Sequence, residues 1–140
     1  MCLEGKWAVG DRIVMAHKEL LDFHRIVAFG DVSGDSSPTH LSDEAARAAH
    51  FPAAIAHGIL GLAFCGRMIE QEFPHHKLLT LEARFVAMTF HCDILGGTGT
   101  IENIDAETEQ MRLSLIVHNQ RSIAVLRGNA TLSKCLALAP

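Results

Sequence analysis

Residues 55–69 are the most apolar stretch of the chain, and this stretch limits the folds that the sequence can adopt. Its composition is that of a helix, interrupted by His57-Gly58 and by a few small residues. A helix that is apolar on most of its faces is stable only when the rest of a domain covers it. We therefore expect this helix to lie inside the domain.

β-Rich runs follow the apolar stretch. The clearest alternates Met111, Leu113, Leu115 and Val117 with mostly polar side chains, which is the period of a strand with one buried face. Turn signals separate the runs, so we expect a mostly antiparallel sheet and an α+β fold class, with the sheet packed on helix. The predicted strands cover residues 78–90, 96–104, 111–118 and 122–132.

The N-terminal part of the sequence predicts shorter elements. An extended stretch at residues 11–16 precedes a helix that Asp22 caps and that ends at Gly30, and Ser42 caps a second helix. Residues 31–40, between these helices, are rich in Gly, Ser, Asp and Pro. Such a composition is typical of a loop.

Size and charge exclude several classes of protein. The chain has 140 residues, 49% of them hydrophobic and 20% charged, so we expect one folded domain over residues 1–140. Its net charge of -4 leaves no surplus of basic groups for nucleic acid. The sequence has no apolar run of about 18 residues and no apolar leader core, so we expect no membrane association and a cytoplasmic location.

The cysteines and histidines do not follow a metal-binding pattern. The four cysteines are widely spaced and lack a C-x-x-C pair, which favours free thiols. The nine histidines form no H-x-x-x-H or H-E-x-x-H pattern. We therefore predict no metal site.

Two titratable residues, Asp35 and His40, lie five positions apart in the predicted loop, where Gly34 and Pro38 favour a fixed bend. A neutral imidazole can take a proton from water near pH 7, and a nearby carboxylate can orient that water. The same residues also fit an Asx-turn aspartate and a surface histidine. Locally, the sequence leaves both interpretations open.

Gly58 opens the apolar helix. The first N–H groups of a helix have no partner within it, and a glycine lets a ligand approach the backbone closely. Gly58 could therefore donate a hydrogen bond to an anionic oxygen. The alternative is that Gly58 only relieves a tight turn, while His57 satisfies a backbone carbonyl.

Together, these blocks resemble a known family. The segment Ser33-Gly34-Asp35 through His40 is followed by Phe51 and then by Ile55-Ala56-His57-Gly58-Ile59-Leu60. Their order and separation are similar to the hydration motif of the (R)-specific enoyl-CoA hydratases, in the MaoC-like family. Weaker similarity extends from Val9-Gly10-Asp11 to Arg84-Phe85 and the terminal strands.

The resemblance implies a single hot-dog domain, in which an antiparallel β-sheet wraps around one long central α-helix from about Gly58 to Gln71. It implies a homodimer or higher homo-oligomer. It also implies a hydro-lyase, in which Asp35 and His40 activate the water that adds across the C2=C3 bond of a trans-2-enoyl thioester to give a (3R)-hydroxyacyl thioester. The Gly58 N–H would bind the thioester oxygen. No cofactor is implied beyond the coenzyme A or carrier protein that holds the acyl group.

The sequence departs from the family pattern at several positions. Ser37 stands where the family usually has Asn, and Gly66 stands where a serine of the long helix supports the active site. With His57, these are the predicted substrate-binding residues. After Arg84-Phe85 the family commonly has Pro-Val and then Gly-Asp, where this chain has Met88-Thr89-Phe90-His91-Cys92-Asp93. The extra room at Gly66 implies a different acyl preference, and the changed segment after Phe85 implies a different strand bend, which affects the dimer edge and the pantetheine channel.

Three other functions remain open on the sequence. The first is a dehydratase acting on a carrier-protein-bound or specialised acyl thioester. The second is a hot-dog thioesterase, for which Glu70 and Glu72 are the acids available on the long helix. The third is a non-catalytic subunit that binds acyl thioesters, against which the intact Asp35 and His40 argue.

Overall fold

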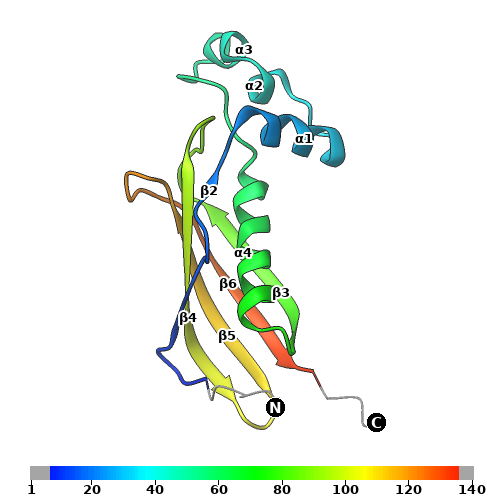
Figure 1. Cartoon of the computed structure of the whole chain (residues 1–140), viewed down its shortest axis with the longest axis vertical. Helices are drawn as coiled ribbons and strands as arrows, with labels where there is room; N and C mark the ends of the chain where they lie inside the picture. Colours follow the sequence, from blue (N-terminus) through cyan, green and yellow to red (C-terminus); the bar gives the residue numbers. More distant parts are fainter. Residues whose placement is uncertain (1–6, 136–140) are drawn as a thin grey trace.

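The computed structural model describes residues 7–135 and places one long helix against a six-stranded antiparallel sheet (Figure 1). The elements, in chain order, are β1 (Arg12–Val14), β2 (Glu19–Leu20), α1 (Phe23–Ser33), α2 (Pro38–Leu41), α3 (Asp43–Ala48), α4 (Gly58–Glu72), β3 (His76–Phe85), β4 (Ile94–Asp105), β5 (Gln110–His118) and β6 (Ala124–Lys134).

The sheet has the strand order β1-β4-β5-β6-β3, and β2 also pairs with β4. All of these pairings are antiparallel, as the sequence predicted. In β5 the apolar side chains at alternate positions, Met111, Leu113, Leu115 and Val117, are buried, whereas those between them are not. One face of the sheet is therefore apolar and needs a cover.

Helix α4 provides that cover. Its buried residues are Leu60, Gly61, Phe64, Cys65, Met68 and Ile69. All of them except Gly61 belong to the same hydrophobic core cluster as the buried side chains of the sheet. Figure 1 shows α4 lying along the hollow of the curved sheet. This is a hot-dog fold, and the helix starts at Gly58, where the resemblance implied its start.

The shorter helices gather at one end of the domain, next to the start of α4 (Figure 1). Asp22 caps α1 as predicted, because its carboxylate accepts a hydrogen bond from the Arg25 N–H at 2.8 Å. The predicted end at Gly30 is wrong, since α1 continues to Ser33 and ends at Gly34, whose φ of 80° is left-handed. The predicted loop also contains the single turn of α2.

An ion-pair network joins this end of the domain to α4. Glu19 is buried, and its carboxylate meets Arg25 of α1 at 2.7 Å and also Arg67 of α4. Both guanidinium groups lie over the ring of Phe64, at 5.4 and 5.6 Å from its centroid. The network ties α1 to the scaffold, and with it the segment that follows α1.

The described residues form one hot-dog domain. The predicted domain limits of 1 and 140 lie outside residues 7–135. No helix within the described part of the chain is long and apolar enough to cross a membrane.

Candidate active site

The segment between α1 and α4 brings Asp35, His40 and His57 together. The Nε2 atom of His40 lies 3.5 Å from Oδ2 of Asp35, and the Nε2 atom of His57 lies 3.9 Å from the same oxygen. The two imidazole rings stack with their centroids 3.9 Å apart. The spacing of Asp35 and His40 on the bent segment therefore brings their functional groups together, as predicted.

Gly30 lets this segment fold back on α1. It is buried, and a Cβ added there would lie 3.0 Å from the backbone oxygen of Asp35. The glycine that the sequence suggested as a helix end thus allows the Asp35 backbone to approach the helix.

Hydrogen bonding fixes the tautomer of neutral His40. Its Nδ1–H donates to the carbonyl oxygen of Ile55 at 2.7 Å, so its Nε2 carries the free lone pair. That lone pair and the Asp35 carboxylate are both acceptors, and neither can donate to the other while Asp35 is ionised. A water molecule can donate one hydrogen to each of them, so the pair is arranged to hold and deprotonate water.

His57 contacts both members of this pair. Its side chain is 2% exposed, and its Nε2–H donates to the backbone oxygen of Asp35 at 2.8 Å. One face of its ring stacks on His40, and Phe29 also contacts it, at a centroid distance of 5.0 Å. Its Nδ1 is buried and has no hydrogen-bond partner within residues 7–135. Of the two sequence interpretations of His57, the structure matches the one in which it satisfies a backbone carbonyl.

The same three residues contain one possible metal ligand atom each, all within 4.8 Å of one another. A metal ion needs lone pairs that converge on one point at about 2.0–2.2 Å. The stacked rings direct their nitrogens side by side, at an interplanar angle of 26°. In addition, the hydrogen on His57 Nε2 is used by the Asp35 carbonyl. The geometry fits a water molecule better than a metal ion.

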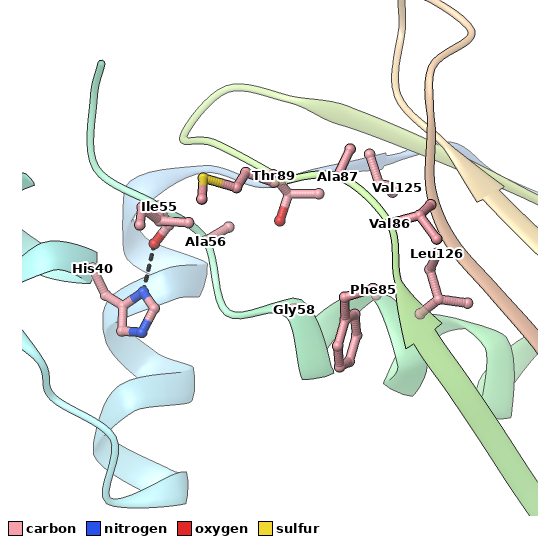
Figure 2. Close-up of a pocket in the computed structure, with 12 residues that line it drawn as sticks. His40, Ile55, Ala56, Gly58, Phe85, Val86, Ala87, Thr89, Val125 and Leu126 are labelled. Atoms are coloured by element: carbon pink, nitrogen blue, oxygen red, sulfur yellow. Dashed lines mark hydrogen bonds between the residues drawn. The ribbon is translucent and has the colours of Figure 1, made fainter. Parts of the chain in front are cut away.

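A pocket of about 440 Å³ opens next to His40 and the start of α4 (Figure 2). Its size is that of a small-molecule site. Gly58 is the first residue of α4, so its N–H has no acceptor within the helix. The pocket is lined by His40, Ile55, Ala56, Gly58, Gly61, Phe85, Val86, Ala87, Met88, Thr89, Val125 and Leu126.

The ring of Phe85 lies close to the backbone of Gly58. A Cβ added to Gly58 would lie 3.0 to 3.3 Å from three atoms of the Phe85 ring. The ring packs directly against the first turn of α4, as Figure 2 shows. The absence of a side chain thus lets an aromatic wall of the pocket approach the unpaired N–H groups.

Backbone pairing closes one side of the pocket. The N–H of Ala56 donates to the oxygen of Thr89 at 2.8 Å, and Ile55 forms an isolated antiparallel bridge with Phe90. The segment before α4 is therefore held against the segment after β3. This pairing was not predicted from the sequence, because the segment before α4 lacks the alternation of a strand and the predicted strand over residues 78–90 ends at Phe85.

The predicted substrate-binding residues lie apart from this pocket. None of Ser37, His57 and Gly66 lines it within the described part of the chain. The hydroxyl of Ser37 is 3.0 Å from that of Thr39, and a Cβ on Gly66 would face Leu81. Their contact with substrate stays a prediction. Sequence reasoning missed Thr89 and Phe85 as pocket residues, because their position depends on the pairing with the segment before α4.

Comparisons with known proteins show that other proteins share this fold. The (R)-hydratase from A. caviae involved in PHA biosynthesis superposes with a TM-score of 0.86 at 19% identity, covering 92% of this chain and 98% of that one. The R-hydratase PhaJ1 from Pseudomonas aeruginosa gives 0.85 at 24% identity, with 96% and 91% covered. A MaoC-like dehydratase from Rhodospirillum rubrum gives 0.79 at 26% identity, with 99% of each chain covered.

No curated protein sequence matches the chain. The family model described as the MaoC like domain matches residues 11–120, which is more than half of the chain. This range includes the three clustered residues, the pocket segment after β3 and the whole of α4. The chain therefore belongs to the family of MaoC-like dehydratase domains.

Proposed function

We propose that this protein is an (R)-specific enoyl-CoA hydratase, which adds water reversibly across the C2=C3 bond of a trans-2-enoyl thioester. One observation carries the proposal. His40, whose free Nε2 lies 3.5 Å from the Asp35 carboxylate, and Gly58, whose N–H starts α4, line the same pocket. A molecule bound in this pocket would therefore lie next to a base and to a hydrogen-bond donor that stabilises developing negative charge.

The proposed reaction starts from a water held between His40 and Asp35. His40 Nε2 takes one proton of this water, while the oxygen of the water bonds to C3 of the substrate. The electron pair of the C2=C3 bond moves toward the thioester oxygen, and the resulting enolate then takes a proton at C2 from the His40–Asp35 pair. Since each step can run backward, the same site also removes water from a 3-hydroxyacyl thioester.

Gly58 stabilises the enolate in this scheme. The helix N-terminus provides an unpaired N–H and a partial positive charge, both directed at the oxygen on which charge develops. Loss of one such donor typically raises a barrier by about 3 kcal/mol. The (3R) configuration is part of the proposal because two of the structural neighbours are (R)-hydratases.

A thioesterase has less support from the structure. The helix acids that it would use, Glu70 and Glu72, lie at the far end of α4. With a rise of about 1.5 Å per residue, they are roughly 20 Å from Gly58. The acids are therefore not placed at the pocket that His40 lines.

The test follows two signals on the same sample of crotonyl-CoA. We expect the conjugated enoyl absorbance to fall to an equilibrium value while no free thiol is released. Release of one thiol per substrate consumed would instead identify a thioesterase, and unchanged absorbance at high enzyme concentration would refute the proposal. Chiral analysis of the product checks for the (3R) isomer.

The carrier of the acyl group is the second part of the proposal. A structural neighbour is a 3R-hydroxyacyl-ACP dehydratase complex from Mycobacterium tuberculosis, with a TM-score of 0.75 at 15% identity. We expect the same acyl group to react faster on coenzyme A than on a carrier protein. A higher kcat/KM with the carrier protein would reassign the enzyme to carrier-bound substrates.

We also propose that the protein forms a homodimer through β3. This strand is at the edge of the sheet, and Leu79, Phe85, Val86 and Met88 in and after it are exposed apolar residues. An uncovered apolar edge strand favours pairing with another chain. Light scattering should give twice the chain mass, and Leu79→Lys should weaken the association. The cytoplasmic location stays a prediction from the sequence.

A further inference from the structure

The pocket wall contains one hydroxyl group that the proposed reaction does not use. Thr89 is 7% exposed and lines the pocket beside Ala56. Its backbone oxygen accepts from the Ala56 N–H, so the position of the residue is fixed by the pairing before α4. Figure 2 shows its side-chain oxygen pointing toward the turn at which α4 starts.

This hydroxyl has no hydrogen-bond partner within residues 7–135, and its oxygen is not one of the fully buried polar atoms, so it is open to the pocket. A ligand that covers a polar group without pairing it removes the hydrogen bond that water makes there, so such a group favours a ligand that can pair with it. The neighbouring pocket residues Ala87, Val125 and Leu126 offer only apolar side chains. The Thr89 hydroxyl is therefore a hydrogen-bonding group surrounded by apolar side chains on this side of the pocket.

The charges around the pocket limit what that partner can be. Among the described residues, the lining side chains include no Lys, Arg, Asp or Glu, and the only titratable one is His40, at the edge where the water is activated. A carboxylate or ammonium group on the acyl chain would have no opposite charge there. An uncharged oxygen, as in an ether, ketone or alcohol, can accept from or donate to the hydroxyl without that cost.

We propose that Thr89 is a specificity-determining residue, which selects acyl thioesters whose chain carries an uncharged oxygen in the part that lies in this pocket. The proposal rests on the proposed function and names its substrate class. A purely alkyl chain would leave the hydroxyl without a partner. An oxygenated chain forms the missing hydrogen bond, which is worth about a three- to ten-fold difference in affinity.

The test uses binding of ligands that cannot be hydrated. Octanoyl-CoA is saturated, and three analogues of it have an ether oxygen in place of the methylene at C5, C6 or C7. Calorimetry gives the dissociation constant of each ligand for the wild-type protein and for Thr89→Val, which replaces the hydroxyl by a methyl group of similar size. Thr89→Ala removes the same hydroxyl and serves if the valine variant does not fold.

For at least one ether analogue, we expect the affinity relative to octanoyl-CoA to fall about three- to ten-fold in Thr89→Val. Thr89→Ser retains a hydroxyl and should keep the wild-type ratio. Thr108→Val is the matched control, because Thr108 is exposed in the turn between β4 and β5 and does not line the pocket. Thermal unfolding checks that the variants are folded.

Two results would overturn the inference. In the first, the ratio is the same in wild type and Thr89→Val for all three ether positions. In the second, all ligands weaken equally, which would place the hydroxyl on the coenzyme A part that they share. Because these ligands do not react, the outcome is independent of hydration. Selective binding without hydration would refute the proposed function alone, and hydration with an unchanged ratio would refute this inference alone.

Discussion

His57 holds both groups of the candidate dyad in place while staying out of the pocket. It donates to the backbone of Asp35 and stacks on the ring of His40. His57→Phe keeps an aromatic face but loses the donor, so we expect kcat to fall about 10- to 100-fold, the scale for misplaced catalytic groups, with little change in KM.

His57→Gln provides the matched control for this residue. Its amide N–H can still reach the Asp35 carbonyl, so part of the lost kcat should return. Steady-state kinetics with crotonyl-CoA measure both variants. A higher KM with unchanged kcat would show that His57 contacts substrate, as the sequence first suggested.

At the residue scale, the sequence predicted which residues lie together better than how their side chains are oriented. Asp35, His40 and Gly58 were singled out because their residue types and mutual spacing resemble a motif, and their catalytic roles stay a prediction. The sequence left two interpretations of His57 open, and the burial of Thr89 was not predictable, since it depends on contact between segments distant in the chain. That contact is the backbone pairing of residues 54–56 with 89–91, which any side chains could make.

At the scale of elements, alanine substitutions at two glycines should have opposite effects on the free energy of unfolding. A Cβ on Gly128 of β6 would collide with the backbone oxygen of Glu82 on β3, so Gly128→Ala must separate the two strands. We expect the free energy of unfolding to fall by about 1–3 kcal/mol, the usual cost of overpacking.

Gly66, in the interior of α4, is the matched control. A Cβ there would make only ordinary contact with Leu81 at 3.9 Å, and alanine favours a helix interior over glycine by about 0.5–1 kcal/mol. Gly66→Ala should therefore raise the free energy of unfolding. Urea denaturation measures both variants, and a destabilised Gly66→Ala together with an unaffected Gly128→Ala would contradict the packing described above.

The elements also show where sequence patterns fail. The antiparallel strands after α4 followed from apolar periodicity, and the start of α4 followed from the resemblance, but the pairing of β3 with β6 was not predicted. The end of α1 was not predicted either, because Gly30 serves close packing against Asp35, whereas Gly34 provides the left-handed end of the helix. A glycine in a sequence does not reveal which of these uses it has.

At the scale of the whole molecule, the position of each cysteine inside or outside the core between α4 and the sheet predicts its reactivity. Burial raises the pKa of the Cys65 thiol from 9.0 to about 12, so the thiol stays neutral at pH 8, whereas Cys92 and Cys135 are exposed. Only the thiolate reacts readily with iodoacetamide. Mass spectrometry should find Cys92 and Cys135 labelled in the native protein, and Cys65 labelled only after unfolding.

The same pKa shift gives a pH dependence. Its contribution to stability is fully present below pH 9, where the thiol is neutral in both states, and is lost as the pH rises from 9.0 toward about 12. Cys65→Ala should therefore flatten the loss of stability across this alkaline range. Rapid native labelling of Cys65 at pH 8 would show that the core is not closed.

The proposed hydration depends on Asp35 and His40 acting on one water molecule. The most direct measurement is the rate of crotonyl-CoA hydration by Asp35→Asn and His40→Gln, with circular dichroism to show that each variant is folded. Since each substitution removes a proton acceptor while keeping the size of the side chain similar, we predict a rate at least about 10²-fold below wild type for both. Near wild-type hydration by either folded variant would contradict the assignment.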